Sequence, residues 1–330
     1  MKCIFCESEI VEDNFSREHI IPKFLGGEKV IHNICNNCNS KFGSDFEKKL
    51  AENDVFNFVR AFYRLKFRDS SKYVTPTIKF KDNATSIRAN EEGYLLMYTK
   101  PNFEYGEKTI EVDQNESPDV VENMIKGKVN SLKSKDNQEY EIIKDIKKLE
   151  IGEPEDFVLD VDIPLITELF IKIAYEFACI CLDSQYFDDD MGCFLKDMII
   201  SGEYDVFSKK SHIKFHYDER KLDFCVRKVC EVAHDNTINN HYGSPLVNCS
   251  NGDYIHEISL LKNNNKFFVS IVLFDIFKCR ICVSENANNW SYEDGLISKL
   301  ITGKGDGKVI NKTDSSFDDI LSRLRNTKLE

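Results

Sequence analysis

The chain has 330 residues, of which 42% are hydrophobic, and this content supports folded cores and excludes an intrinsically disordered protein. It lacks a run of 18 apolar residues and an apolar N-terminal stretch, so we expect no membrane span, no secretory signal and a cytoplasmic location. The net charge of −12 argues against extended contact with nucleic acid, except in residues 1–72, where 12 Lys and Arg face 11 Asp and Glu.

Four cysteines near the N-terminus are spaced as zinc ligands. Cys3 and Cys6 form one Cys-x-x-Cys pair, and Cys35 and Cys38 form a second. Two such pairs supply four thiolates, the donor set of a closed, tetrahedral zinc site with a structural role. The segment between them is short and polar, so metal binding is expected to supply its folding free energy.

The remaining cysteines lie mostly in apolar stretches of the chain. In a reducing compartment such residues behave as small hydrophobic side chains, so we expect them in the core and not in disulfides. They are Cys179, Cys181, Cys193, Cys225, Cys230, Cys249, Cys279 and Cys282.

A longer motif runs through the cysteine pairs. Residues 15–27 read FSREHIIPKFLGG, and Cys38 is followed by NSKFG. With the two pairs, these elements resemble the HNH family of ββα-metal nucleases, in its zinc-knuckle branch. The resemblance covers roughly residues 1–50. It implies a ββα-metal fold that hydrolyses phosphodiester bonds of nucleic acid, with DNA as the expected substrate.

The resemblance also implies roles for individual residues. His19 is the general base that takes a proton from the attacking water. Glu18 and Asn39 stand where the family has its acidic ligand and its helix ligand, and their oxygens suit catalytic Mg²⁺ or Mn²⁺. On a strand Glu18 and His19 point to opposite faces, so one site needs both at a strand end or bend. The alternative is a packed, polar His19 and a surface charge at Glu18.

The middle position of the motif departs from the family pattern. Many members have an Asn about five residues before the third cysteine, and this place is Val30 here. Asn33 and His32 lie two and three residues before Cys35. We assign the orienting role to Asn33 and count it, with Glu18 and His19, among the expected catalytic residues. If neither Asn33 nor His32 fills the middle position of the motif, the module would cleave slowly or not at all.

Two helices are expected after the motif. Ser44 and Glu47 form a capping-box pattern, which predicts a helix starting just after Gly43. Asp54 is expected to cap the next helix, whose apolar residues from Val55 onward recur at helical spacing. Basic side chains in this part are expected to contact phosphate groups, with a solvated helix face as the alternative. They are Lys41, Arg60 and Arg64.

The chain is therefore predicted to be α+β, with a small zinc-bound ββα-metal module followed by a larger mixed α/β domain. We place the first domain, the nuclease module with its docking helices, at residues 1–72 and the second at 73–330. In the second we predict β-like runs at 73–115, helices at 118–133 and 163–182, a meander at 253–284 and a short helix at 316–324. The helix at 163–182 is apolar nearly all round, so it is expected to be buried.

Three hypotheses about function stand at this point. The first is a metal-dependent endonuclease, and the others are an inactive zinc module that binds nucleic acid and a scaffold subunit that docks a partner. Residues 73–330 loosely resemble uncharacterised C-terminal halves that accompany such modules in bacterial proteins. They are expected to select targets, dock a protein partner or a second copy, or restrain the nuclease. Restraint would fit an anti-phage or restriction effector.

Overall fold

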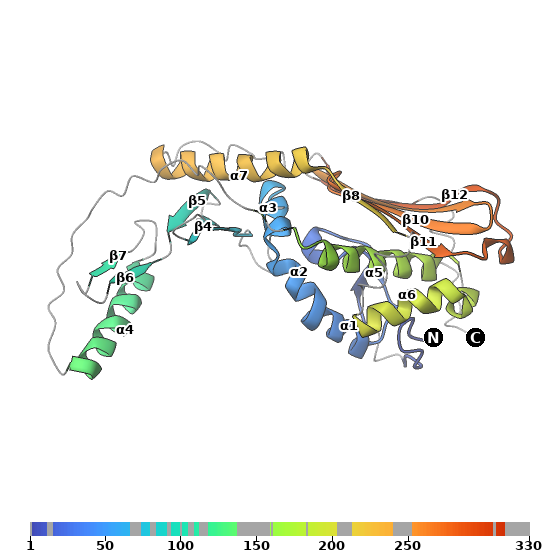
Figure 1. Cartoon of the computed structure of the whole chain (residues 1–330), viewed down its shortest axis with the longest axis horizontal. Helices are drawn as coiled ribbons and strands as arrows, with labels where there is room; N and C mark the ends of the chain where they lie inside the picture. Colours follow the sequence, from blue (N-terminus) through green and yellow to red (C-terminus); the bar gives the residue numbers. More distant parts are fainter. Residues whose placement is uncertain are drawn as a thin grey trace.

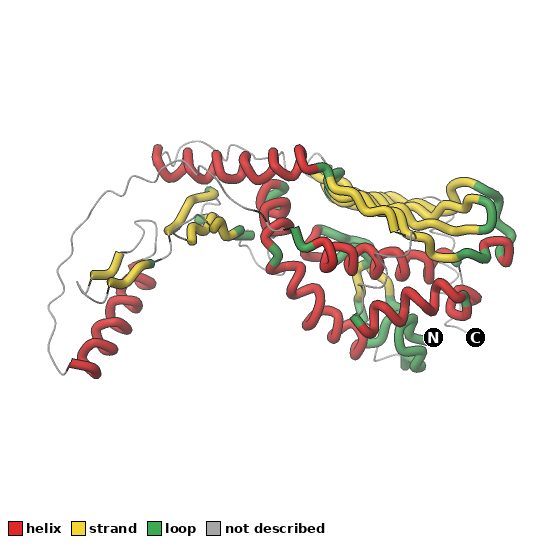
Figure 2. Tube along the Cα trace, in the orientation of Figure 1, coloured by secondary structure: helices red, strands yellow, loops and turns green. Residues whose placement is uncertain are grey.

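The computed structural model contains both helices and strands, so the chain is α+β as predicted (Figures 1 and 2). It describes residues 2–11, 16–66, 74–79, 84–90, 94–99, 101–104, 109–111, 118–136, 159, 161–182, 184–202, 213–239, 253–305 and 308–313. The predicted helix at 316–324 lies outside these ranges. No helix in the described part is long and apolar enough to cross a membrane.

The N-terminal part is a short hairpin followed by helices. Strands β1 (Glu18–His19) and β2 (Val30–Ile31) pair antiparallel, and a short 3-10 helix, η2 (Lys23–Leu25), lies in the loop between them. Three helical segments and a π turn follow. These are α1 (Asn36–Phe42), the π turn η3 (Gly43–Glu47), α2 (Lys48–Glu52) and α3 (Asp54–Phe62).

Both predicted helix starts in this part lie too late in the chain, the first by about two turns and the second by one residue. The first helix begins at the second cysteine pair, because Cys35 caps it and its sulfur accepts from the Cys38 amide. Ser44 lies inside the continuing helical segment, and its hydroxyl donates to the Lys41 carbonyl. The next helix is capped by Asn53, whose side chain accepts from the first amides, so Asp54 is its first residue.

The largest element is a six-stranded antiparallel sheet. Its strand order is β13-β12-β9-β10-β11-β8. The central meander, β9 (Tyr254–Asn263), β10 (Lys266–Leu273) and β11 (Phe277–Ser284), confirms the prediction for 253–284. The outer strands, which were not predicted, are β8 (Ile213–Tyr217), β12 (Gly295–Gly305) and β13 (Lys308–Thr313). A short 3-10 helix, η6 (Ala287–Asn289), follows β11.

Two helices cover one face of this sheet (Figure 1). Helix α5 (Ile163–Cys181) confirms the predicted buried helix, and every residue from Leu169 to Cys181 is buried. Helix α6 (Asp190–Ser201) follows it after the 3-10 turn η4 (Ser184–Asp188). Of the cysteines predicted to be core residues, Cys193 is half-buried, Cys249 is outside the described part and the other six are buried.

Smaller elements extend from the main body (Figure 1). Strands β3 (Thr77–Lys79), β4 (Ala84–Ala89) and β5 (Leu95–Thr99) form one sheet, and β6 (Asn102–Glu104) pairs with β7 (Thr109–Glu111). These strands confirm the prediction for 73–115, and α4 (Pro118–Asp136) confirms the helix at 118–133. The long helix α7 (Glu219–Asn239) contacts both α3 and β5.

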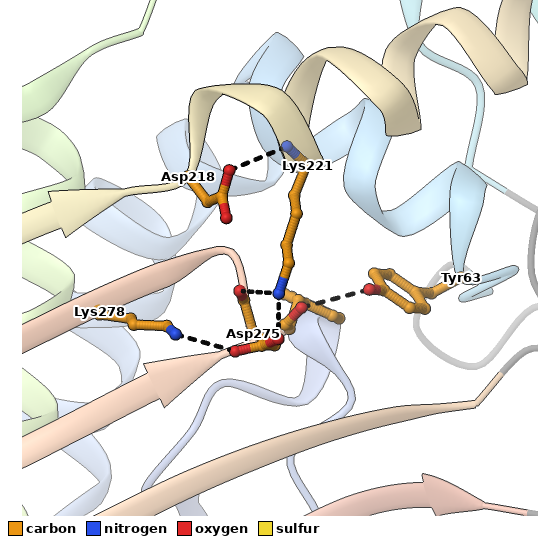
Figure 3. A network of polar contacts seen from close by, with 6 residues as sticks. Tyr63, Asp218, Lys221, Asp275 and Lys278 are labelled. Carbon is orange, nitrogen blue, oxygen red and sulfur yellow. Dashed lines mark hydrogen bonds and ion pairs between the residues drawn. The ribbon is translucent and has the colours of Figure 1, made fainter.

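The end of α3 is tied to the turn between β10 and β11 (Figure 3). The Tyr63 hydroxyl donates to the Phe274 carbonyl at 3.2 Å. Asp275, the next residue of the turn, ion-pairs with Lys221 of α7 and, at 3.0 Å, with Lys278 of β11. One continuous core of buried residues runs from Cys3 near the N-terminus to Leu300 in β12. The N-terminal part and the six-stranded sheet are therefore packed as one body.

Candidate functional site

The four N-terminal cysteines come together as expected. Their sulfur atoms all lie within 4.8 Å of one another, and Cys6 Sγ and Cys35 Sγ are 3.7 Å apart. Tetrahedral Zn²⁺ with Zn–S bonds of about 2.3 Å separates its sulfurs by about 3.8 Å. The cluster of Cys3, Cys6, Cys35 and Cys38 therefore fits zinc in both donor type and size.

Backbone amides support the same cluster. The Cys35 amide points to Cys3 Sγ at 3.4 Å, and the Cys38 amide points to Cys35 Sγ at 3.5 Å. Such contacts favour the thiolate form that binds zinc. Without metal, burial raises the pKa of the Cys3 and Cys38 thiols. At Cys6 burial has the same effect, but hydrogen bonds with Ser8 outweigh it and lower the pKa to about 6.

The hairpin next to the cluster places His19 in β1, opposite Val30. His19 is half-buried, whereas Glu18 is only 3% exposed, so the two side chains leave the strand on opposite sides. A tight loop follows β1. Gly26 has φ +84°, and a Cβ added at Gly27 would lie 1.8 Å from the Ile21 carbonyl oxygen. Only glycine fits Gly27, and the close approach fixes the path of the chain beyond His19.

The buried side of β1 faces helix α5. Lys172 of α5 is 1% exposed, and its ammonium lies 2.5 Å from Glu18 Oε1. Two more carboxylates surround it, with Glu176 Oε1 at 3.0 Å and Glu47 Oε1 at 3.5 Å. Neither of these two oxygens receives a well-directed hydrogen bond from any described residue. The hydrogen bond of Lys172 therefore goes to Glu18, and the other two carboxylates act through charge.

Charge balance dominates this cluster. Burial alone would favour neutral Lys172, but Glu176, Glu18 and Glu47 outweigh it and hold the pKa of Lys172 well above its usual range. Burial also raises the pKa of Glu176 well above that of an exposed carboxyl group. The cluster therefore holds a charged lysine among three acidic side chains, with the Glu18 carboxylate closest to its ammonium.

The two expected asparagines lie on either side of Cys35. Asn33 Oδ1 is buried and has no hydrogen-bond partner among the described residues, while the Asn33 carbonyl accepts from the Ile4 amide at 3.0 Å. His32, the alternative for the middle position, is exposed and its Nδ1 lies 3.1 Å from the Ser16 carbonyl oxygen. Asn39 is half-buried in α1, one turn before Phe42. The unused Asn33 oxygen is the stronger candidate to orient a neighbouring group.

The three residues expected to bind phosphate differ in how exposed their side chains are. Lys41 is exposed and Arg64 half-buried, so both can present their charge to solvent. Arg60 is 1% exposed, and its Nη1 donates to the Ala51 carbonyl and to Asn57 Oδ1. Its guanidinium also lies 5.3 Å from the centre of the Phe24 ring. The structure therefore does not place Arg60 where it could contact phosphate, because the side chain packs between helices and the loop after β1.

Sequence reasoning missed the partners that α5 contributes. Lys172 and Glu176 are charged residues one turn apart in the buried stretch from Leu169 to Cys181, which has no other charged residue. That contrast is the signal that could have identified them, because buried charges need partners. Tyr175, on the same face, donates its hydroxyl hydrogen bond to the Ile4 carbonyl at 2.6 Å.

Comparison with known protein families finds a match in the N-terminal part. No curated protein and no solved structure matches the chain. Residues 3–55 match the family model described as HNH endonuclease, and this range contains the four cysteines, both strands of the hairpin and α1. Residues 3–55 are therefore similar to HNH endonucleases, and this similarity covers the cysteine cluster and the hairpin that carries His19.

Proposed function

We propose that the protein is an endonuclease that hydrolyses phosphodiester bonds of nucleic acid, with DNA as its substrate and His19 as general base. The observation that carries the proposal is the position of His19. It lies half-buried on a hairpin whose other end joins the zinc-binding cluster, inside the segment that matches HNH endonucleases. A restrained, partly solvent-accessible imidazole is what proton abstraction from water requires.

The chemistry needs a base and positive charge near the phosphate. The neutral His19 ring accepts a proton from water as the water oxygen attacks phosphorus. Lys41 and Arg64 are the exposed or half-exposed cations of this part that we assign to holding the phosphate backbone. Asn33, with its unused buried oxygen, is proposed to orient the base.

A divalent ion such as Mg²⁺ or Mn²⁺ would neutralise charge on the transition state when bound. Asn39, half-buried on α1, remains a proposed ligand for it. The geometry does not support Glu18 in the same role. Its carboxylate is buried on the opposite side of β1 from His19 and is bound to Lys172.

Plasmid cleavage by purified full-length protein with added Mg²⁺ or Mn²⁺ tests the proposal. His19→Ala should lower the cleavage rate by about 10² to 10⁴, the usual range for a general base, with substrate binding largely retained. Because only the neutral ring accepts a proton, the wild-type rate should rise with pH. His216→Ala, which removes an exposed histidine of β8, is the matched control and should cut normally. Unimpaired cleavage by His19→Ala would refute the mechanism.

A second candidate function is a zinc module that binds nucleic acid without cutting it, or that docks a partner. The buried pairing of Glu18 with Lys172 favours it, because the expected acidic ligand is occupied. A wild-type protein that binds plasmid and never nicks it with any divalent metal would select this candidate. Elution in a stable complex with another protein would select the scaffold role.

A further inference from the structure

Helix α5 contacts the N-terminal part through Lys172 and Tyr175, and Glu176 lies beside them. Lys172 binds Glu18 of β1, Tyr175 donates to the Ile4 carbonyl in the first cysteine pair, and Glu176 completes the charge around Lys172. These contacts join segments more than 150 residues apart in sequence. One turn of α5 therefore holds both the cysteine cluster and the strand that carries His19.

The geometry of β1 determines on which side of the strand the Glu18 side chain lies. Glu18 and His19 are consecutive residues of a two-residue strand in regular register with β2, opposite Ile31 and Val30. Consecutive strand side chains point to opposite faces, and the burial of Glu18 against the half-exposed His19 follows this rule. A metal bound by Glu18 Oε1 would lie on the α5 side, where the Lys172 ammonium is 2.5 Å from that oxygen.

We infer that Lys172 is a positioning residue that, through its contact with the Glu18 carboxylate, fixes β1 and the direction of the His19 imidazole, and that Glu18 is its partner and not a ligand of the catalytic ion. The inference rests on the proposed function. Removing one partner of a buried ion pair leaves an uncompensated charge, so the surrounding backbone rearranges. Here that backbone is β1, a strand of only two residues.

Two substitutions separate the positioning role from a ligand role. Glu18→Gln keeps an amide oxygen that accepts from Lys172, so the positioning role predicts cleavage within about 10-fold of wild type. Lys172→Met removes the donor, so the same role predicts a cleavage rate at least about 100-fold lower. If Glu18 is instead a ligand, the order reverses. Glu18→Gln then abolishes cleavage, and Lys172→Met spares it because a competitor for the carboxylate is gone.

Binding of Mn²⁺, measured by calorimetry on zinc-loaded full-length protein, gives a readout independent of cleavage. The positioning role predicts that both variants bind Mn²⁺ within about 3-fold of wild type. A 10-fold or larger loss in Glu18→Gln, or tighter binding in Lys172→Met, overturns the inference. Lys196→Met is the matched control, because Lys196 of α6 also pairs with the N-terminal part, at Glu7, but away from β1. It should bind and cut as wild type does.

A third measurement tests the positioning role even if Lys172→Met does not fold or the proposed function is wrong. If Lys172→Met does not fold, Lys172→Gln/Glu176→Gln removes one positive and one negative charge and takes its place. The NMR signals of the His19 ring should move in the variant that lacks Lys172 and stay in place in Glu18→Gln. A protein that neither cuts nor binds Mn²⁺ refutes the proposed function, and the His19 signals still decide the positioning role. His19 signals that stay in place in all variants refute the positioning role.

Discussion

Lys41 of α1 and Arg60 of α3 show how two basic residues of the N-terminal part differ in what they can do. Both were expected to contact phosphate, yet Lys41 is exposed and Arg60 is buried, with a hydrogen bond to Ala51 near the end of α2. Burial lowers the pKa of Arg60 to about 10, which still leaves it charged at neutral pH. Lys41 is free to exchange counterions with a polyanion, whereas Arg60 is part of the packing.

Substitution should therefore separate the two residues. Lys41→Ala should leave the free energy of unfolding within about 0.5 kcal/mol of wild type. It should lower the slope of the logarithm of the DNA-binding constant against the logarithm of salt concentration by about one. Arg60→Ala should destabilise the fold by roughly 2–3 kcal/mol, because it removes buried hydrogen bonds and packing against Phe24. Denaturant unfolding and salt-titrated binding measure both. An Arg60→Ala protein of normal stability that has lost only DNA affinity would contradict the burial.

At the residue scale, the sequence predicts which residues form the site better than it predicts what surrounds each of them. The cysteine spacing was enough to predict the cluster, because four ligands within a short segment can converge only around a shared centre. The environment of Glu18 was not predictable, because its partner lies in α5 and only the tertiary fold brings the two together. For the same reason the amphipathic pattern around Arg60 could not tell a solvated side chain from one packed on Phe24.

Among the elements, α1 is built most directly on the four-cysteine cluster. Its first residue follows Cys35, and the Cys35 sulfur both caps the helix and belongs to the four-cysteine cluster. A helix of seven residues is too short to be stable alone, so the cluster must hold its start. The capping-box prediction failed here because the cysteine cap acts earlier in the chain than Ser44.

Removal of zinc should therefore unfold the hairpin and α1 while the six-stranded sheet persists. Metal analysis should find one zinc per chain, and Cys35→Ser should lose it. Because burial raises the pKa of the Cys3 and Cys38 thiols, zinc binding must release protons and its affinity should increase with pH. Hydrogen exchange with and without a chelator reports the region affected. Unchanged protection of α1 in zinc-free protein would contradict this dependence.

At the scale of the whole molecule, His256 joins the six-stranded sheet to the loop between β1 and β2. It is fully buried in β9, with Nε2 2.9 Å from the Leu25 carbonyl oxygen and Nδ1 accepting from the Phe274 amide. The ring therefore donates through one nitrogen and accepts through the other, as neutral imidazole does. Burial lowers the pKa of His256 from 6.5 to about 4, against the opposing effect of the Leu25 carbonyl.

The lowered pKa of His256 predicts how the stability of the fold changes at acid pH. Between pH 6.5 and 4 the unfolded chain binds a proton at His256 that the folded chain does not, so stability decreases as pH falls through this window. The full loss from this residue is about 3 kcal/mol. His256→Gln should show a correspondingly shallower pH dependence in denaturant unfolding. His216→Gln, at an exposed site, should keep the wild-type slope. Equal slopes for wild type and His256→Gln would contradict a buried neutral ring.

The contact between Glu18 and Lys172 spans 154 residues of sequence, and this separation has a consequence for biosynthesis. A ribosome adds about 5–20 residues per second, so α5 follows β1 by about 8–30 s. Throughout that interval the nascent chain contains His19 but not the lysine that we infer to fix its strand. On the proposed function, cleavage would therefore begin only after α5 has emerged from the ribosome.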